Sequence, residues 1–501
     1  MRLPRASGIL LHPTSLPGPH GGGDLGPAAY HFVNWLVAAG QKLWQILPLT
    51  GIGPGNSPYM SPSAFAGNVL LVDLADLAAQ GWLQAGDLDV PAGRFADARV
   101  DYAAMVPWRM QRLALAAAGF AERATPEQRA AHDAFCARHA HWLEDYALFM
   151  ALAEAQPGRD WADWPAALAR RDPGVLREAA LQHAGRLAFW RFAQWQFFAQ
   201  WGRLRAYANV RGVSIVGDAP IFIAPQSADA WARQDLFELD ADGRQRVVAG
   251  VPPDYFSATG QRWGNPLYRW SAHAADGYAW WTERIRHTFA LVDVVRIDHF
   301  RGFAAYWEIP AAEPTAIHGR WVPGPGPALF EAIAAALGPL PVIAEDLGVI
   351  TPDVDALRHA TGFPGMRVLQ FAFDGKPDNP YLPHNYAPDT VVYTGTHDND
   401  TTLGWWRAAG AGEREHAARY LGHAAAELDT GIHWAMLRAA WASVADTAIA
   451  PLQDVLGLPS EHRMNLPGEA DGHWAWRFGW DMVQPAHAER LAALTRLYGR
   501  G

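Results

Sequence analysis

Four carboxylates stand where short apolar runs of this sequence end. Asp218 ends SIVGD, Asp298 ends VVRID, Glu345 follows PVIA, and Asp398 follows VVYTGTH. One acidic residue at such a place is common, because Asp often caps the helix that follows. Four of them indicate a shared acidic site. Carboxyl groups held close together acquire different pKa values, which gives an ionised nucleophile beside a protonated acid. Enzymes that cleave and re-form glycosidic bonds use such a pair.

A metal site is the alternative interpretation. His299 and His397 lie next to two of these carboxylates, and clustered Asp and His side chains can hold a divalent ion. Arg296 favours the sugar interpretation, because it lies two residues before Asp298 and therefore faces the same side of a strand. Its guanidinium would repel a cation and keep Asp298 ionised. Each histidine can cap a helix, complete the core or hydrogen-bond a sugar hydroxyl.

The apolar runs themselves predict the elements that position these side chains. Several are apolar on both faces, as expected of strands in a covered parallel sheet. Helical patterns at 29–39, 277–290, 326–337 and 354–361 separate many of them, which is the βα alternation of a (β/α)8 barrel. In such a barrel the functional residues lie at the C-terminal ends of the strands. The eight predicted strands are 8–11, 42–47, 213–217, 292–297, 341–344, 367–371, 390–393 and 447–452.

Length predicts large insertions between these elements. A minimal barrel needs about 250 residues, whereas this chain has 501. Residues 103–209 are rich in Ala, Arg, Glu and Leu, with aromatic residues such as Trp142, Tyr146 and Phe149 at helical spacing. We therefore expect one catalytic barrel over residues 1–501, with a largely helical insertion subdomain at 70–210.

Composition narrows the class of partner. Hydrophobic residues make up 50% of the chain and charged residues 18%, and no apolar run approaches 20 residues, which excludes a disordered chain and a membrane span. The formal charge of −10 is opposite to that of nucleic-acid and anionic-membrane binders, so a neutral partner is expected. The single cysteine, Cys136, cannot form an internal disulfide. The first apolar stretch is too short for a signal peptide, and we expect a cytoplasmic protein.

Several longer segments of the sequence resemble those of one known protein family. In their content and order they closely resemble glycoside hydrolase family 77, the amylomaltases or 4-α-glucanotransferases (disproportionating enzymes) of the α-amylase clan. The resemblance implies a (β/α)8 barrel without a separate C-terminal β-domain. The matching segments are GILLHPTSLPG (8–18), WQILPL (44–49), NSPYMSPSAFAGN (56–68), GDAPIFI (217–223), GVPPDYFSATGQRWGNPLY (250–268), RIDHFRGF (296–303), IAEDLG (343–348), PGMRVLQFAF (364–373), GTHDNDTTLGWW (395–406) and RMNLPG (463–468).

The resemblance also implies a role for each acidic residue. Asp298 in RIDHFRGF resembles the nucleophile of a retaining double displacement, and Glu345 in IAEDLG resembles the general acid/base. Asp398 in GTHDND resembles the residue that hydrogen-bonds the 2- and 3-hydroxyls of the transferred sugar. Asp218 resembles the clan's acidic residue after strand three, which orders the site. The residues that resemble supports around the donor sugar are Arg296, His299 and His397.

The carboxylates alone do not separate a transferase from a hydrolase. Transfer requires a sugar hydroxyl to reach the intermediate before water does, and sugar rings stack on aromatic planes. Tyr255 and Trp263 lie in a Gly/Pro-rich segment that resembles the family's active-site cover loop, expected over residues 245–275. Tyr59 resembles a glucan-contacting tyrosine, and Asn465 a loop asparagine near the same groove. Tyr102 marks a candidate second glucan site.

The predicted function is 4-α-glucanotransfer between α-1,4-glucans, namely maltooligosaccharides, amylose and glucose, without a metal or other cofactor. Two further classes of protein are alternatives. A noncatalytic glucan-binding protein on a degenerate barrel would lack one of the catalytic carboxylates, and none is missing from this sequence. A metal-dependent hydrolase would lose its activity to a strong chelator.

Overall fold

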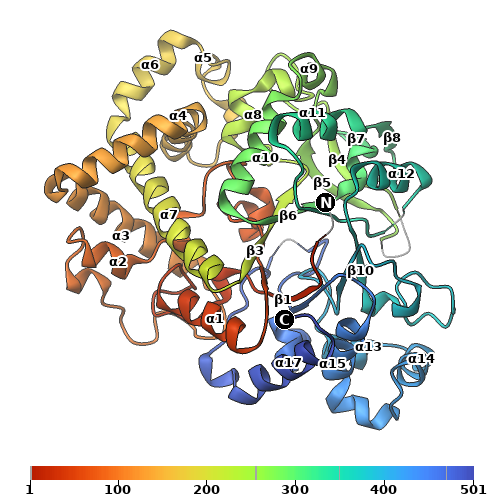
Figure 1. The fold of residues 1–501 in the computed structure, drawn as a ribbon. Helices are drawn as coiled ribbons and strands as arrows, with labels where there is room; N and C mark the ends of the chain where they lie inside the picture. Colours follow the sequence, from red (N-terminus) through yellow and green to blue (C-terminus); the bar gives the residue numbers. More distant parts are fainter. Residues whose placement is uncertain (1–2, 254–256, 349, 470) are drawn as a thin grey trace.

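A computed structural model, which describes residues 3–253, 257–348, 350–469 and 471–501, shows a barrel of eight parallel strands surrounded by helices (Figure 1). Each of the eight predicted strands overlaps one of them, so the predicted barrel is confirmed. In spatial order the strands are β10 (Gly365–Val368), β11 (Thr390–Tyr393), β12 (Thr447–Pro451), β1 (Ala6–Leu10), β2 (Leu43–Gln45), β3 (Ser214–Pro220), β6 (Val294–Asp298) and β9 (Val342–Ala344).

The barrel closes between β9 and β10 through a short seam. There the backbone N–H of Ala344 donates to the carbonyl of Pro364 at 2.9 Å. The carboxylate of Asp346 extends this contact, because its Oδ1 accepts the backbone N–H of Met366 at 2.6 Å. The Asp346 side chain therefore replaces a backbone hydrogen bond between β9 and β10, and it is the residue directly after the candidate acid Glu345.

Apolar side chains fill the interior of the barrel. Every strand contributes at least one buried residue to a single cluster, which is the packing expected of a barrel of this size. The interior residues of this cluster are Leu10, Leu43, Val216, Val294, Ile343, Met366, Val368, Val391, Tyr393 and Ile449.

Helices cover the outside of the barrel. Four of them coincide with predicted helices: α1 (Pro27–Ala38), α10 (Ala279–Leu291), α11 (Pro327–Leu337) and α12 (Pro352–Thr361). Proline at the first position begins α1, α11 and α12, where a missing N–H costs nothing. Gly362, at φ +67°, ends α12 in the left-handed conformation that glycine adopts without strain. Within the described ranges, no helix is long and apolar enough to cross a membrane.

Besides the short helix α2 (Leu74–Ala79), five α-helices lie between β2 and β3 on one side of the barrel. They are α3 (Tyr102–Arg123), α4 (Pro126–Ala155), α5 (Ala166–Ala169), α6 (Pro173–Gln182) and α7 (Ala184–Val210), drawn in orange to yellow in Figure 1. A capping box of Thr125 and Gln128 starts α4. Aromatic side chains such as Trp142, Tyr146 and Trp190 pack between the long helices. The subdomain boundaries at 70 and 210 remain a prediction.

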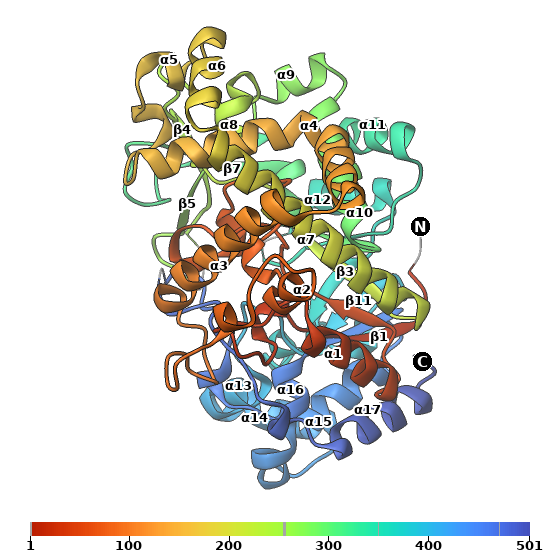
Figure 2. The same ribbon diagram turned by 90° about the vertical axis from the view of Figure 1, so that its left-hand side faces the viewer.

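The sequence did not predict a second sheet of four antiparallel strands. Its order is β5 (Gln261–Pro266), β4 (Val247–Val251), β7 (Ala305–Pro310) and β8 (Arg320–Pro323). Part of the segment expected as a cover loop at 245–275 therefore forms two of these strands. The sheet lies beside the barrel in both ribbon views (Figures 1 and 2). After β12, the described residues contain helices and loops but no further strand.

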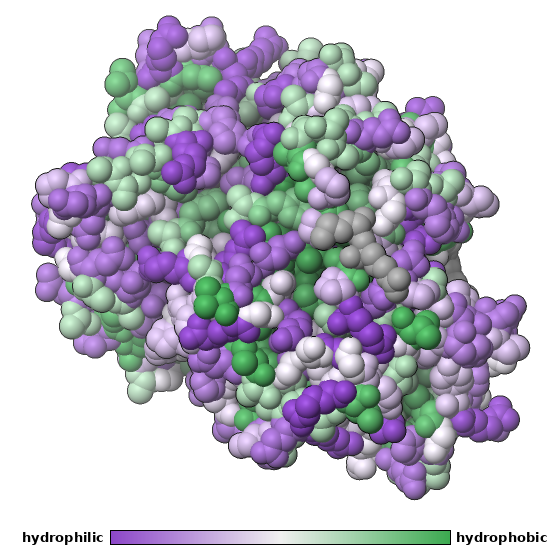
Figure 3. Space-filling model, in the orientation of Figure 1, coloured by the Kyte–Doolittle hydropathy of each residue, from purple (hydrophilic) through white to green (hydrophobic). Residues whose placement is uncertain are grey.

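Two short helices, α8 (Ala228–Ala232) and α9 (Trp270–Ala275), follow β3 and β5. The remaining α-helices lie in the C-terminal part of the chain: α13 (Thr402–Ala408), α14 (Ala411–Leu421), α15 (Ala425–Ala442), α16 (Leu452–Leu456) and α17 (Pro485–Leu497). Strand β1, near the start of the chain, and helix α17, near its end, lie on the same side of the molecule in Figure 2. On the face seen in Figure 3, hydrophobic residues form small patches between hydrophilic ones.

Candidate active site

Arg296 lies between two carboxylates on neighbouring strands. It sits opposite Asp218 in the register of β3 and β6, and its Nη1 is 2.6 Å from Asp218 Oδ2. Its Nη2 is 2.9 Å from Oδ1 of Asp298, two residues further along β6. The side chain of Asp218 is fully buried, whereas that of Asp298 is 28% exposed. Asp298 is therefore the carboxylate of this group that an incoming molecule can reach.

Burial and neighbouring charges have opposite effects on the pKa values of Arg296 and Asp298. Burial alone would lower the pKa of Arg296, but Asp218 and Asp298 outweigh it and raise that pKa well above its usual value. Burial raises the pKa of Asp298 to about 6, although Arg296 opposes the rise. Arg296 therefore favours the ionised form of Asp298, as the sequence indicated, but the loss of solvation exceeds the attraction of the guanidinium and leaves the pKa of Asp298 raised.

Glu345 follows β9 and is held by two backbone amides. Its Oε2 accepts the N–H of His299 at 2.8 Å, and its Oε1 accepts the N–H of Leu347 at 2.7 Å. Burial raises the pKa of Glu345 to about 7, with Arg296 opposing and Asp298 adding to the rise. A carboxyl with this pKa is partly protonated at neutral pH, which a general acid requires.

The backbone turns sharply after Asp298 and so directs an amide toward Glu345. His299 has φ +52° and ψ +48°, a left-handed conformation that only a few per cent of non-glycine residues adopt. Burial lowers the pKa of its imidazole to about 3, so the ring is neutral. The Trp263 ring of β5 meets it edge-on, with ring centroids 4.8 Å apart. His299 Nε2 is buried without a hydrogen-bond partner among the described residues, and such an atom is available to a ligand hydroxyl.

Asp398 lies in the loop after β11 and is held from two sides. Its Oδ1 accepts a hydrogen bond from Asn465 Nδ2 at 2.6 Å, and its Oδ2 is 3.3 Å from His397 Nε2. The backbone N–H of Asn465 also donates to the carbonyl of His397 at 3.1 Å. The Asp398 side chain nevertheless stays 40% exposed. It is therefore fixed in orientation and still open to a ligand.

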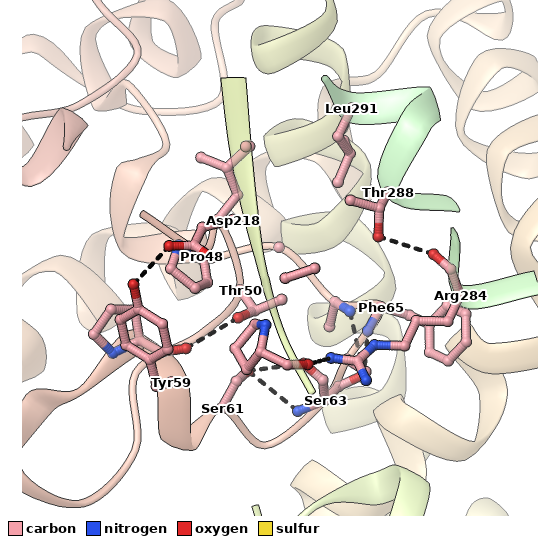
Figure 4. Close-up of a pocket in the computed structure, with 18 of the residues that line it drawn as sticks. Pro48, Thr50, Tyr59, Ser61, Ser63, Phe65, Asp218, Arg284, Thr288 and Leu291 are labelled. Carbon is pink, nitrogen blue, oxygen red and sulfur yellow. Dashed lines mark hydrogen bonds between the residues drawn. The ribbon is translucent and has the colours of Figure 1, made fainter. Parts of the chain in front are cut away.

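Tyr59 connects Asp218 with the pair His397 and Asp398. It lies in the short helix η3 (Pro58–Met60) after β2, and its hydroxyl donates to Asp218 Oδ2 at 2.8 Å (Figure 4). The same oxygen is 2.9 Å from His397 Nε2, and the two rings stack with centroids 5.4 Å apart. Burial, aided by Asp218, raises the pKa of Tyr59 well above its usual value, which keeps the hydroxyl protonated as a donor.

The described residues thus bring ten of the eleven predicted site residues into one connected group. Tyr255 lies outside the described residues. Asp293, the other acidic residue near β6, binds Arg205, Asn209 and the N–H of Ile215 instead. The connected residues are Tyr59, Asp218, Trp263, Arg296, Asp298, His299, Glu345, His397, Asp398 and Asn465.

Two further residues complete the site. Arg463 donates from Nη2 to the carbonyl of Asp398 and from Nε to that of Asn465, both at 2.8 Å. The ring of Trp474 packs beside Tyr59. Arg463 could have been found from its motif, RMNLPG, which it shares with Asn465. Trp474 follows the last of the matching segments, and only the folded chain reveals its contacts.

Tyr102 does not present the surface expected of a second glucan site. Its side chain is buried, at 8% exposure, and its hydroxyl donates to the carbonyl of Trp474 at 2.8 Å. Little of the ring is therefore left for a sugar to stack on. The described residues also contain no group of three or more His, Cys, Asp or Glu side chains that could hold a metal ion.

Comparison with known proteins agrees with this arrangement. Residues 11–482 match the family model of glycoside hydrolase family 77, described as 4-alpha-glucanotransferase. The 4-alpha-glucanotransferase of Thermus thermophilus is 53% identical over 498 residues, which cover 99% of each chain. That of Synechocystis is 48% identical over 499 residues, covering 99% of this chain and 98% of the relative.

A solved structure supports the same relationship. The amylomaltase from Streptococcus agalactiae, in complex with acarbose, superposes with a TM-score of 0.96 at 38% sequence identity, covering 99% of this chain and all of the other. The barrel, its acidic strand ends and these similarities lead to one conclusion: the chain belongs to glycoside hydrolase family 77, the 4-alpha-glucanotransferases.

Proposed function

We propose that this protein is a 4-α-glucanotransferase that moves a 1,4-α-glucan segment from a donor chain to the 4-hydroxyl of an acceptor glucan or glucose. The observation that carries the proposal is the pair of partly exposed carboxyls, Asp298 and Glu345, on adjacent strand ends within a family of 4-alpha-glucanotransferases. Burial places the pKa of Glu345 above that of Asp298, which is the order that an acid and a nucleophile need.

The first step forms a covalent intermediate. Ionised Asp298 attacks the anomeric carbon of the donor sugar, and the bond from that carbon to the glycosidic oxygen breaks. Glu345 gives its proton to this oxygen, so the reducing-end part of the donor leaves as a free sugar. Arg296, which contacts Asp298 at 2.9 Å, favours the ionised form of the nucleophile and orients it.

The second step reverses the roles of the first. Glu345, now ionised, takes the proton from the 4-hydroxyl of an acceptor sugar. The acceptor oxygen bonds to the anomeric carbon, and the bond to Asp298 breaks, which restores the free carboxylate. Two inversions at one carbon retain the α configuration.

The other side chains hold the donor sugar. Asp398 accepts hydrogen bonds from the 2- and 3-hydroxyls of the transferred sugar, and its contacts with Asn465 and His397 fix its orientation. Tyr59 and Asp218 order the same side of the site through their shared hydrogen bond. Because these groups are positioned before substrate arrives, little reorganisation is needed in the transition state.

Transfer prevails over hydrolysis when the acceptor side binds a sugar ring and excludes water. Trp263 offers an aromatic plane next to His299, on a strand of the small sheet. Tyr255 belongs to the same segment, over residues 245–275, which we propose covers the site. Aromatic rings suit a neutral polymer because they grip the C–H faces of sugars without charge.

Incubation with maltotriose alone tests the proposal. The expected products are glucose and longer maltooligosaccharides, while the concentration of reducing ends stays nearly constant, because each transfer breaks one glycosidic bond and forms another. Chromatography of the products and a reducing-sugar assay measure both quantities over time. A rise in reducing ends with every cleavage would identify a hydrolase instead.

The substrates proposed on this basis are maltooligosaccharides and amylose as donors, with glucose or a glucan as acceptor. We further propose a cytoplasmic location, on the grounds of the single cysteine. The helical segment 70–210 is proposed as an insertion subdomain of a single catalytic barrel.

A further inference from the structure

Trp474 has an unusual backbone conformation beside the active site. Its φ is +63°, which is a genuine outlier for so bulky a residue. Its backbone N–H donates to the carbonyl of Met464 at 2.8 Å, and its side chain is 9% exposed. A left-handed conformation of this kind persists only where the surrounding structure holds it in place. The contacts of Trp474 therefore indicate both what holds it and what it supports.

The ring of Trp474 supports two residues of the donor side. Its centroid lies 5.6 Å from that of Tyr59 and 5.9 Å from that of His397, with interplanar angles near 40° in both cases. Tyr59 in turn bonds Asp218, and His397 contacts Asp398. Trp474 therefore contacts both rings of the aromatic pair that holds Asp218 and Asp398.

The segment at 98–102 holds Trp474 and its neighbours from the other side; we call it the strut. Tyr102 at its end donates from its hydroxyl to the carbonyl of Trp474 at 2.8 Å. The N–H of Val100 donates to the carbonyl of Ala475 at 2.7 Å, and the N–H of Arg477 donates to the carbonyl of Ala98 at 3.0 Å. Tyr102 is also the first residue of α3, so the strut connects the helical segment to the wall of the active site.

We propose that Trp474 and the strut are positioning elements for catalysis: Tyr102 fixes the strained Trp474, which fixes the rings of Tyr59 and His397 against the donor sugar. This inference rests on the proposed function, because it assigns these two rings to the donor side. Trp474 and Tyr102 are positioning residues, since they act through Tyr59 and His397.

A loss of this support has a specific kinetic signature. Tyr59 and His397 hold hydroxyl and carboxylate partners at 2.8 to 3.3 Å, and small displacements of such groups weaken contacts that are strongest in the transition state. We therefore expect kcat to fall, while the KM for maltotriose, which depends on the whole bound chain, changes little.

The first experiment compares two tyrosine hydroxyls. Tyr102→Phe removes the hydroxyl that donates to the Trp474 carbonyl at 2.8 Å and that also hydrogen-bonds the Thr14 side chain. The matched control is Tyr207→Phe, which removes a hydrogen bond of 2.8 Å from the Tyr207 hydroxyl to Asn34 Oδ1. Tyr207 lies near the end of α7, which leads into the start of β3, and is therefore away from the catalytic strand ends. We expect Tyr102→Phe to lower kcat for maltotriose disproportionation by at least about threefold, with KM within about twofold, and Tyr207→Phe to leave both unchanged.

The second experiment tests the ring itself. Trp474→Phe keeps an aromatic plane behind Tyr59 and His397, whereas Trp474→Ala removes it. We expect the phenylalanine variant to retain more than half of the wild-type kcat and the alanine variant to lose at least about tenfold. Thermal unfolding is measured for every variant to confirm that it folds. If Trp474→Ala does not fold, the test uses Tyr102→Phe and Trp474→Phe alone.

The outcomes separate this inference from the proposed function. Wild-type protein that does not disproportionate maltotriose refutes the function. Active wild-type protein, combined with equal kcat for Tyr102→Phe and Tyr207→Phe, refutes the positioning role alone. A Trp474→Phe variant as impaired as Trp474→Ala refutes the assignment of that role to an aromatic ring.

Discussion

At the scale of single residues, Arg296 is the centre of the site. It is almost completely buried, and its two terminal nitrogens contact Asp218 and Asp298. An isolated buried guanidinium would be very costly, and two carboxylates compensate for its loss of solvation. The arrangement leaves one carboxylate, Asp298, partly exposed and able to react, while the other remains a structural partner.

Replacement of the nucleophile is predicted to abolish turnover. Asp298→Asn keeps the volume of the side chain but cannot form the covalent intermediate, so kcat should fall by roughly a thousandfold or more. Binding of a maltooligosaccharide, measured by calorimetry, should persist because Asp398 and Tyr59 are unchanged. Asp293→Asn is the control at a nearby acidic residue that binds Arg205 away from the site. Near-normal turnover by Asp298→Asn would contradict the assignment.

The raised pKa values predict a narrow pH profile. Asp298 must be ionised and its pKa is raised to about 6, so activity should fall as the pH drops through that value. Glu345 must be protonated and its pKa is raised to about 7, so activity should fall as the pH rises through that value. The plot of kcat/KM against pH, which reports the free protein, should therefore be bell-shaped with a maximum at about pH 6.5. A plateau from about pH 5 to about pH 9 would contradict both values.

The residues of the site differed in how far the sequence could predict them. Asp298, Glu345 and Asp398 follow strand ends in motifs, so pattern and resemblance find them together. The pKa of Asp298 could not be predicted, because it depends on how much solvent the folded site removes. Trp474 could not be predicted either, since its partner Tyr59 lies more than 400 residues away in the chain.

At the scale of elements, the seam between β9 and β10 restricts which residues the barrel can accept. The chain there approaches itself so closely that Gly365 has no room for a side chain: a Cβ at this position would lie 2.3 Å from Asp346 Oδ2. The carboxylate cannot move away without losing the N–H of Met366. Glycine is thus required by close approach, and Asp346 holds β10 beside the residue that carries the reacting proton.

The seam predicts opposite effects for two glycine-to-alanine substitutions. Gly365→Ala should destabilise the protein by about 1–3 kcal/mol through overpacking against Asp346. Gly202→Ala, in the exposed middle of α7 where nothing lies within 4 Å of the new Cβ, should stabilise it by about 0.5–1 kcal/mol because alanine favours helix. Thermal unfolding checks both directions, and equal effects would contradict the account of the seam.

The fold was predictable where the signal is local. Each barrel strand is a short apolar run, and each of the four predicted helices has its own periodicity. The small antiparallel sheet was missed for two reasons. Strand β5 has the sequence QRWGNP, in which glycine, asparagine and proline disfavour a strand. Its neighbour β4 pairs with β7, more than 50 residues further along the chain, and no local pattern encodes that pairing.

At the scale of the whole molecule, charge and substrate are matched. The chain carries a formal charge of −10, and its acidic residues include the reacting pair. A neutral glucan is neither attracted nor repelled by this field, so association depends on shape, aromatic contact and hydrogen bonds. The aromatic residues, 24 of them tryptophan, mostly pack the core, as Trp142 does, while Trp263 lies beside the site.

Because the proposed substrate is neutral, we predict that the reaction is insensitive to salt. Added salt screens charges over a Debye length of about 10 Å at 0.1 M, which slows only the association of charged partners. Between about 20 mM and about 300 mM NaCl at fixed pH, kcat/KM for maltotriose should change by less than about twofold. Initial rates at low substrate concentration measure it. A steep decline with salt would indicate an electrostatically steered substrate.

The order of strands in the barrel has a consequence for synthesis of the protein. Strand β1 pairs with β2 on one side and with β12 on the other. The ribosome adds about 5–20 residues per second, so β1 waits on the order of tens of seconds for its second neighbour. Throughout that time one edge of an apolar strand, Ala6–Leu10, lacks its final partner, and unpaired edges of this kind recruit other chains. The nascent chain therefore needs that edge shielded until residue 451 has left the ribosome.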